Sequence, residues 1–273
     1  MILFGVFFIF PVLQSIFYSF TNWNGFAFTQ FKGLNNYSYI FRSDIDFWNS
    51  FRFTVSYTII NTLMLNICAL FLAKILTSGI FAEEKLRIAF FLPNMLSIVV
   101  VGIFWNFIFG PLSTEIFKVT QLAFFGLPWL SRLPIAVISV SIAQTWAALG
   151  WYTLIYIAGY QSVPREIYEA CEVDGCIGFR RFLKVTIPLL MPSITINFFT
   201  SLTQGLQVFD LVFSLTSGGP GKMTETVIMN IYNTSFRSMY YGFGSAKTVI
   251  LSIVVLVVGY TQIYFTRKKE VVH

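Results

Sequence analysis

Segment 159–186 carries acidic and basic side chains at a spacing that could form a charged, amphipathic surface. Ser162 followed by Pro164 is typical of a helix start, and Gly175 can end that helix. Acidic residues precede the glycine and basic residues mixed with aromatic ones follow it: Glu166, Glu169, Glu172 and Asp174, then Phe179, Arg180, Arg181, Phe182 and Lys184. The pattern predicts a short, charged helix-turn-helix. The residues alone leave two interpretations open, a helix pair at the lipid interface or a docking site for a soluble partner.

A second group of polar residues forms a stripe in segment 187–209. Steps of three and four place its five members on one face of a helix: Asn197, Thr200, Ser201, Gln204 and Gln207. Amide and hydroxyl groups inside a membrane could line a water-filled path and bind a solute. They could equally hydrogen-bond to neighbouring helices, at roughly 0.6 kcal/mol per pair. The stripe by itself favours neither interpretation.

Several other kinds of chemistry are excluded. His273 is the single histidine, so histidine-based triads and multi-histidine metal sites cannot form, and no metal site is expected. The three cysteines make neither a disulfide framework nor a Cys-x-x-Cys pair. The run from Gly218 to Met223 is not a phosphate-binding loop, because Met223 replaces the required Ser or Thr and Thr216 stands where the first Gly is needed. The chain has no nucleotide site of its own.

The elements that must position these residues follow from where charge is absent. The chain of 273 residues is 56% hydrophobic and 11% charged, whereas soluble domains have about a quarter charged residues. Six windows lack charge: 1–20, 53–73, 88–109, 134–158, 187–209 and 248–266. Each is long enough for a helix to cross a bilayer, and none alternates as a barrel strand would. The sequence predicts an all-α integral membrane protein with six transmembrane helices in one domain, 1–273. An enzyme is not expected, because the windows contain no Asp, Glu, His, Lys or Arg.

The basic residues set the orientation. Arg267, Lys268 and Lys269 follow the last window, so both termini are predicted to be cytoplasmic. Segments 74–87, 159–186 and 267–273 are then inside, with about twice the density of Lys and Arg found in outer segments 21–52, 110–133 and 210–247. This bias accounts for the net charge of +6 without a nucleic-acid partner. Residues 1–20 lack the features of a signal peptide and are expected to span the membrane.

The loop between the fourth and fifth windows carries a longer pattern. It consists of Glu169-Ala170-Cys171, then Gly175 after three residues, then Val185-Thr186-Ile187-Pro188 after nine more. This pattern resembles the EAA loop of ABC importer permeases. Cys171, Val185 and Ile187 depart conservatively from that pattern. The resemblance implies the type I ABC importer permease fold, in which this loop docks into a cytoplasmic ATPase. It assigns the ATPase contact to Glu169, Ala170 and Gly175, with Asp174 close by. Residues 159–186 are called the coupling segment below.

A second pattern narrows the resemblance. The run Phe209-Asp210, followed by Thr216-Ser217-Gly218-Gly219-Pro220, is similar to a segment of the permeases that import oligosaccharides and glycerol phosphodiesters. Of the two permease subunits in such a transporter, this chain resembles the one that corresponds to the larger maltose-transporter subunit. In that subunit, spans four and five hold the sugar. Aligning the two patterns without a gap implies a substrate site in this chain formed by Trp151, Ala148, Ser201, Gln204, Gly205 and Val208. Ala147, Trp105 and Asn106 are weaker candidates. Trp151 suits a sugar because its ring can stack on C–H groups, and Gln204 can bind hydroxyls. Departures from the maltose pattern indicate a different solute.

The resemblance implies an inner-membrane permease subunit of a binding-protein-dependent importer that works by alternating access. Its implied partners are a second permease subunit, two copies of an ABC ATPase, an extracellular solute-binding protein, a carbohydrate and membrane lipid. No cofactor is expected in this chain, because ATP and Mg²⁺ would belong to the ATPase. An importer of amino acids or metals is the alternative within the same class, and a stand-alone channel is a more distant one.

Overall fold

The computed structural model describes residues 2–27, 30–79 and 83–268. These residues are helical or irregular, apart from an isolated bridge between Thr21 and Phe31. The first helices are α1 (Ile2–Phe4), η1 (Gly5–Ile9), α2 (Phe10–Tyr18), α3 (Asn35–Ser43) and α4 (Ile45–Leu76). The middle ones are α5 (Glu83–Phe91), η2 (Leu92–Met95), α6 (Ile98–Phe107), η3 (Ile108–Leu112), α7 (Ser113–Thr120) and α8 (Leu133–Ser162). The last are α9 (Arg165–Val173), α10 (Gly178–Arg181), η4 (Phe182–Thr186), α11 (Ile187–Leu189), α12 (Met191–Leu206), α13 (Asp210–Thr216), α14 (Val227–Tyr232), η5 (Asn233–Arg237) and α15 (Tyr241–Arg267). The all-α prediction is confirmed for the described residues.

Within the described ranges, four helices are long and apolar enough to cross a membrane: α4, the continuous helix Ile98–Thr120, α8 and α15. A fifth crossing is possible through the pair Gly178–Leu189 and Met191–Leu206, which is bent by 73°. The apolar helix Gly5–Tyr18 is shorter. The chain therefore has several membrane-crossing helices, while the number six and the cytoplasmic termini stay predictions.

The window 88–109 is not one helix, and that prediction is wrong. α5 ends at Phe91, a short 3₁₀ turn follows, and Leu96 and Ser97 have extended backbones with ψ of 146° and 134°. Pro93 lies in the turn, where its ring and missing N–H oppose a continuous α-helix. The helix that restarts at Ile98 runs to Thr120, beyond the end of the charge-free window.

Other helices extend past the charge-free windows. α4 begins at Ile45, where the Asp44 side chain accepts a hydrogen bond from the Phe47 N–H at 2.9 Å and caps the helix. α15 begins at Tyr241 and so includes Lys247, which the sequence placed in an outer segment. The absence of charge marks where a helix can lie in hydrocarbon, but backbone hydrogen bonding continues the same helix into the polar region.

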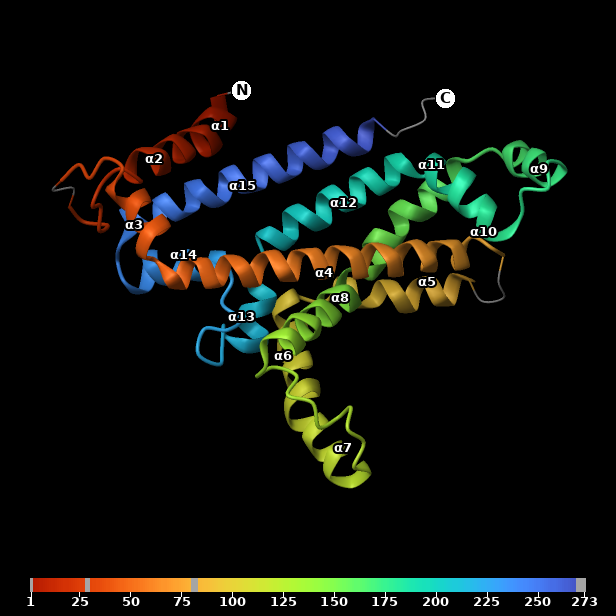
Figure 1. Ribbon diagram of the computed structural model, residues 1–273, viewed down its shortest axis with the longest axis horizontal. Coiled ribbons are helices and arrows are strands. Elements are labelled where there is room, and N and C mark those ends of the chain that lie inside the picture. Colours follow the sequence, from red (N-terminus) through yellow and green to blue (C-terminus); the bar gives the residue numbers. More distant parts are fainter. Residues whose placement is uncertain (1, 28–29, 80–82, 269–273) are drawn as a thin grey trace.

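The helices pack into an elongated body from which one arm projects (Figure 1). α4 runs along the body beside α8, and α12 packs on both α4 and α15. α3 and α14 lie at one end of the body, and α9 and α10 lie at the other. The segment from α6 to α7 leaves the body and points away from it. This arrangement places α4, α8 and α12 around the stripe of polar residues and presents the coupling segment at one end.

Candidate functional site

A small cavity of about 30 Å³ lies between α4, α8 and α12 and is called the inner cavity. Four residues predicted to bind substrate line it: Ser201, Gln204, Gly205 and Val208. The remaining lining residues were missed by the sequence reasoning: Tyr57, Asn61 and Leu65 of α4, with Gln144 and Tyr152 of α8. Four of these five residues carry a polar or amphipathic side chain inside a charge-free window, whereas Leu65 gave no signal in the sequence. Nothing in the sequence indicated that α4 faces α12 here.

Hydrogen bonds fix the polar wall of the inner cavity. The Tyr152 hydroxyl donates to the Gln204 side-chain carbonyl at 3.2 Å. The Asn66 amide donates to the Ser201 hydroxyl at 3.0 Å and accepts from the Tyr156 hydroxyl at 2.7 Å. The two predicted polar residues are therefore held in place by partners on α4 and α8.

Asn61 has an unsatisfied atom in the same wall. It is 3% exposed, and its side-chain carbonyl oxygen has no hydrogen-bond partner among the described residues. Buried polar groups are normally paired, and an unpaired one costs about 1–3 kcal/mol. A ligand hydroxyl that reaches this oxygen would remove that cost.

Gly205 allows α12 to lie close to α4. A Cβ built at Gly205 would lie 2.9 Å from the Thr58 methyl group and 3.2 Å from the Thr58 Cα. Small residues of this kind let helix backbones approach in membranes. Gly205 thus shapes the wall, and Val208 closes it with a buried side chain.

Trp151 and Ala148 do not line the inner cavity. Trp151 is 52% exposed on the surface of this chain, one residue before the cavity residue Tyr152. Ala148 packs in a buried apolar cluster with Leu65 and Tyr152. The structure therefore brings together four of the six predicted substrate residues and leaves these two outside the cavity.

The other candidates from the sequence do not line the inner cavity and instead make contacts within or between helices. The Asn197 amide donates to the Tyr152 backbone carbonyl at 3.0 Å and joins α12 to α8. The Thr200 hydroxyl donates within its own helix, to the Ile196 carbonyl. The weaker candidate Asn106 donates to the Leu215 carbonyl at 2.7 Å. The indole ring of Trp105 packs against Phe109 and Trp146, and Ala147 lies in the same apolar core.

The inner cavity can hold a water molecule in this arrangement but not a sugar ring, since small-molecule sites have roughly 300–1,000 Å³. Binding of a larger solute requires α12 to move away from α4 and α8. The lining comes from three helices and from Val208, which follows α12, so the volume of the inner cavity depends on how α4, α8 and α12 are placed relative to one another.

The predicted coupling residues are exposed at one end of the body. Glu169 and Ala170 lie on α9, Asp174 follows the helix, and Gly175 ends it with φ of +68°, a conformation that favours glycine. Within the described ranges, the carboxylates of Glu169 and Asp174 make no ion pair. All four residues are free to contact another protein.

The coupling segment is held together internally and presents apolar side chains. Arg181 forms an ion pair with Glu172 at 2.6 Å, which joins α10 to α9. Val173, Ile177 and Phe179 are each more than half exposed. Apolar side chains gathered around unpaired carboxylates are typical of an interaction surface.

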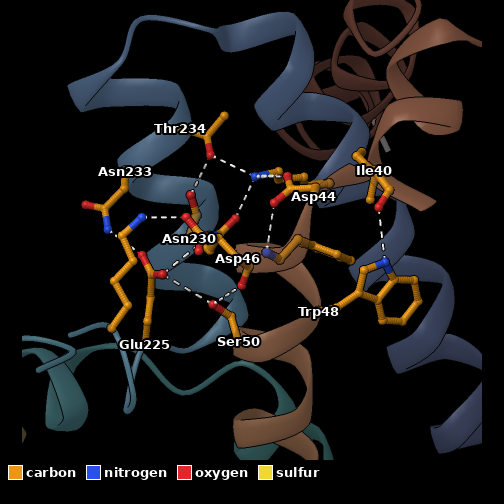
Figure 2. Close-up of polar contacts among 12 residues, drawn as sticks. Ile40, Asp44, Asp46, Trp48, Ser50, Glu225, Asn230, Asn233 and Thr234 are labelled. Atoms are coloured by element: carbon orange, nitrogen blue, oxygen red, sulfur yellow. Dashed lines mark hydrogen bonds and ion pairs between the residues drawn. The ribbon is translucent and has the colours of Figure 1, made fainter. Parts of the chain in front are cut away.

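The opposite end of the body contains an outer polar cluster, made of Asp44, Ser50, Glu225, Asn230, Asn233, Thr234 and Lys247. Lys247 is 3% exposed, and its ammonium group lies 2.8 Å from the Asp44 carboxylate. It also donates to Asn230 at 2.6 Å and to Thr234 at 3.0 Å. Figure 2 shows Glu225 between Ser50 and Asn233, and both donate to its carboxylate. The cluster joins α4, α14, η5 and α15.

A nearby ion pair fixes the loop before Glu225. The hydrogen bond to the Asp46 carboxylate raises the pKa of Lys222. This pair and the outer polar cluster fix loop 217–226 against the start of α4.

Comparison with known families and sequences gives consistent matches. Residues 67–271 match the family described as "Binding-protein-dependent transport system inner membrane component". The chain is 36% identical to the probable starch degradation products transport system permease protein AmyD of Thermoanaerobacterium thermosulfurigenes, over 96% of this chain and 89% of that protein. It is 33% identical to the multiple sugar-binding transport system permease protein MsmF of Streptococcus mutans, over 97% of this chain and 92% of that protein.

The fold is also similar to a solved structure. One chain of a bacterial ABC transporter involved in the import of the acidic polysaccharide alginate superposes with a TM-score of 0.82. The match covers 98% of this chain and 92% of that chain, at 17% sequence identity. At that identity, the likeness establishes the fold.

Proposed function

The chain belongs to the family of binding-protein-dependent transport system inner membrane components, and from that membership we propose that it imports a carbohydrate as one permease subunit of an ATP-driven transporter. The relatives described as permeases for starch degradation products and for multiple sugars support this solute class. The departures from the maltose pattern favour a sugar other than maltose.

In the proposed arrangement the chain spans the membrane six times with both termini in the cytoplasm. The helix Gly5–Tyr18 and its neighbours form the first crossing, and the bent pair ending in α12 forms the fifth. The coupling segment is then cytoplasmic, and the outer polar cluster faces the solute-binding protein. A second permease subunit is required, because one chain cannot enclose a path.

The proposed transport cycle uses the inner cavity and the coupling segment as two linked sites. Ser201, Gln204, Gly205 and Val208 form the solute site together with Asn61, while Trp151 and Ala148 contribute from α8 when the helices separate. Glu169, Ala170, Asp174 and Gly175 contact one of two cytoplasmic ATPase copies. ATP and Mg²⁺ are bound by the ATPase, whose closure moves α9 and through it the spans. Coupling requires that these contacts differ between the two states.

The observation that carries the ATPase-coupling part of the proposal is the exposed coupling segment, which presents the unpaired carboxylates of Glu169 and Asp174 together with the exposed apolar side chains of Val173 and Ile177. The test is a pull-down of the tagged chain from detergent-solubilised membranes, followed by an ATPase assay on the proteins that co-purify. We expect Glu169→Lys to leave membrane insertion intact and to abolish both ATPase recovery and sugar uptake. Glu115→Lys on α7 is a control for charge reversal at an exposed glutamate outside the coupling segment, and it also breaks the exposed ion pair of Glu115 with Lys118. Normal uptake by the Glu169→Lys variant would contradict the assignment.

A further inference from the structure

A second cavity lies at the end of the body that carries the coupling segment. It has a volume of about 630 Å³ and is bounded by the ends of α4 and α8, by α9 and by α10. Its volume is in the range of small-molecule sites. It shares no lining residue with the inner cavity. This space is called the basic cavity below.

The basic cavity is lined by three cations and one carboxylate. Lys74 comes from α4, Arg165 and Glu172 from α9, and Arg181 from α10. Arg181 is paired with Glu172, which leaves the other two cations without an acidic partner among the residues that the structure describes. The Lys74 ammonium group instead lies 5.0 Å from the centre of the Phe182 ring. Unpaired charges of one sign around a common space repel each other, and an anion between them removes that repulsion.

Hydrogen-bonding groups accompany the two free cations. Tyr160 lines the basic cavity, and its buried hydroxyl has no hydrogen-bond partner in the described structure. Gln161 also lines the cavity and adds an amide group. Arginine suits phosphate because its donors form a planar fork, and lysine binds phosphate as a point charge. The lining therefore fits an anion with several acceptor oxygens.

We propose that the basic cavity binds a phosphate group, supplied either by the headgroup of an anionic phospholipid or by free phosphate in the cytoplasm. Basic pockets between transmembrane helices on the cytoplasmic side are typical sites for phosphate-bearing headgroups. The bound phosphate bridges Arg165 on α9 to Lys74 on α4, so it fixes the coupling segment against the end of a span. The cytoplasmic location and the effect on coupling rest on the proposed function, whereas the binding itself does not.

The lipid test uses the chain with its co-purifying subunits in nanodiscs of phosphatidylcholine alone or mixed with phosphatidylglycerol. Native mass spectrometry measures which lipid stays bound. We expect the wild type to retain phosphatidylglycerol preferentially, and the double variant Lys74→Gln/Arg165→Gln to lose roughly 30-fold in that preference, from about 1 kcal/mol per basic residue. Arg180→Gln and Lys184→Gln are the matched controls, because both residues lie in the coupling segment but do not line the cavity.

Inorganic phosphate added to phosphatidylcholine nanodiscs distinguishes the second source. If free phosphate is the ligand, it raises the melting temperature of the wild type and of both controls but not of the double variant. Size-exclusion chromatography verifies that the double variant still assembles. The proposal is overturned if wild type and double variant retain lipid equally and respond equally to phosphate, or if the controls lose binding as strongly.

ATPase activity of the same samples separates this proposal from the proposed function. If the chain binds phosphate but no ATPase co-purifies with it, only the proposed transport function is contradicted. An active, sugar-importing complex without phosphate binding contradicts only the present inference.

Discussion

Replacement of Lys247 by Met tests whether the outer polar cluster holds the ends of the helices together. Methionine has a similar length and keeps the apolar stem, but it removes the ammonium group that contacts Asp44, Asn230 and Thr234. Asp44 is only 10% exposed, so its carboxylate is left buried without a counter-charge. Breaking a buried ion pair from one side costs about 3–5 kcal/mol. We expect Lys247→Met to lower the free energy of unfolding by that amount.

The assay is equilibrium unfolding by sodium dodecyl sulphate in mixed micelles, followed by tryptophan fluorescence. The double variant Lys247→Met/Asp44→Asn is the decisive comparison, because it removes both charges and most of the penalty with them. We expect the double variant to recover at least half of the lost free energy. The argument that the pair is buried and coupled is refuted if the double variant is as unstable as Lys247→Met. It is also refuted if Lys247→Met lies within about 0.5 kcal/mol of wild type, which is the usual range for surface substitutions.

Two further predictions concern the inner cavity. Gly205→Ala places a methyl group 2.9 Å from the Thr58 methyl group. We therefore expect overpacking to lower the free energy of unfolding by about 1–3 kcal/mol, measured in the same micelles. Replacement of the exposed Gln207 by a larger side chain is the control. Asn61→Leu removes an unpaired buried carbonyl, so we expect unchanged or higher stability together with a 5- to 150-fold loss in apparent solute affinity, which corresponds to about 1–3 kcal/mol. Uptake measured against sugar concentration checks the second point, and unaltered affinity would show that Asn61 does not contact the solute.

The class of the protein and its coupling segment could be predicted from the sequence because both depend on local properties. A charge in hydrocarbon is costly wherever the helix packs, so charge-free windows mark most of the crossing helices. The pattern from Glu169 to Pro188 is continuous in the sequence, and its helix and glycine turn form where the spacing indicates. The stripe containing Ser201 and Gln204 followed from helical periodicity alone.

Proline illustrates what the sequence left undecided. Pro93 lies in a break between two helices, whereas Pro134 begins α8 and Pro111 lies inside a helical segment. The same residue type has different effects because neighbouring helices and local backbone adjustments can satisfy the carbonyl groups that proline frees. Pro134 is accommodated in the first turn of α8, where its missing N–H is no loss, whereas Pro111 continues a helix through a local π-helical segment that its residue type alone does not predict.

The tertiary structure alone decided which polar residues face a cavity and which join helices. Asn197 and Ser201 share one stripe of α12, yet Asn197 only joins α12 to α8, whereas Ser201 accepts from Asn66 of α4 and also lines the inner cavity. Asn61 became a candidate because α12 approaches α4 at Gly205. Helical periodicity gives the face on which a side chain lies. The partner opposite that face is set by residues distant in the sequence, and the contacts between helices bring them together.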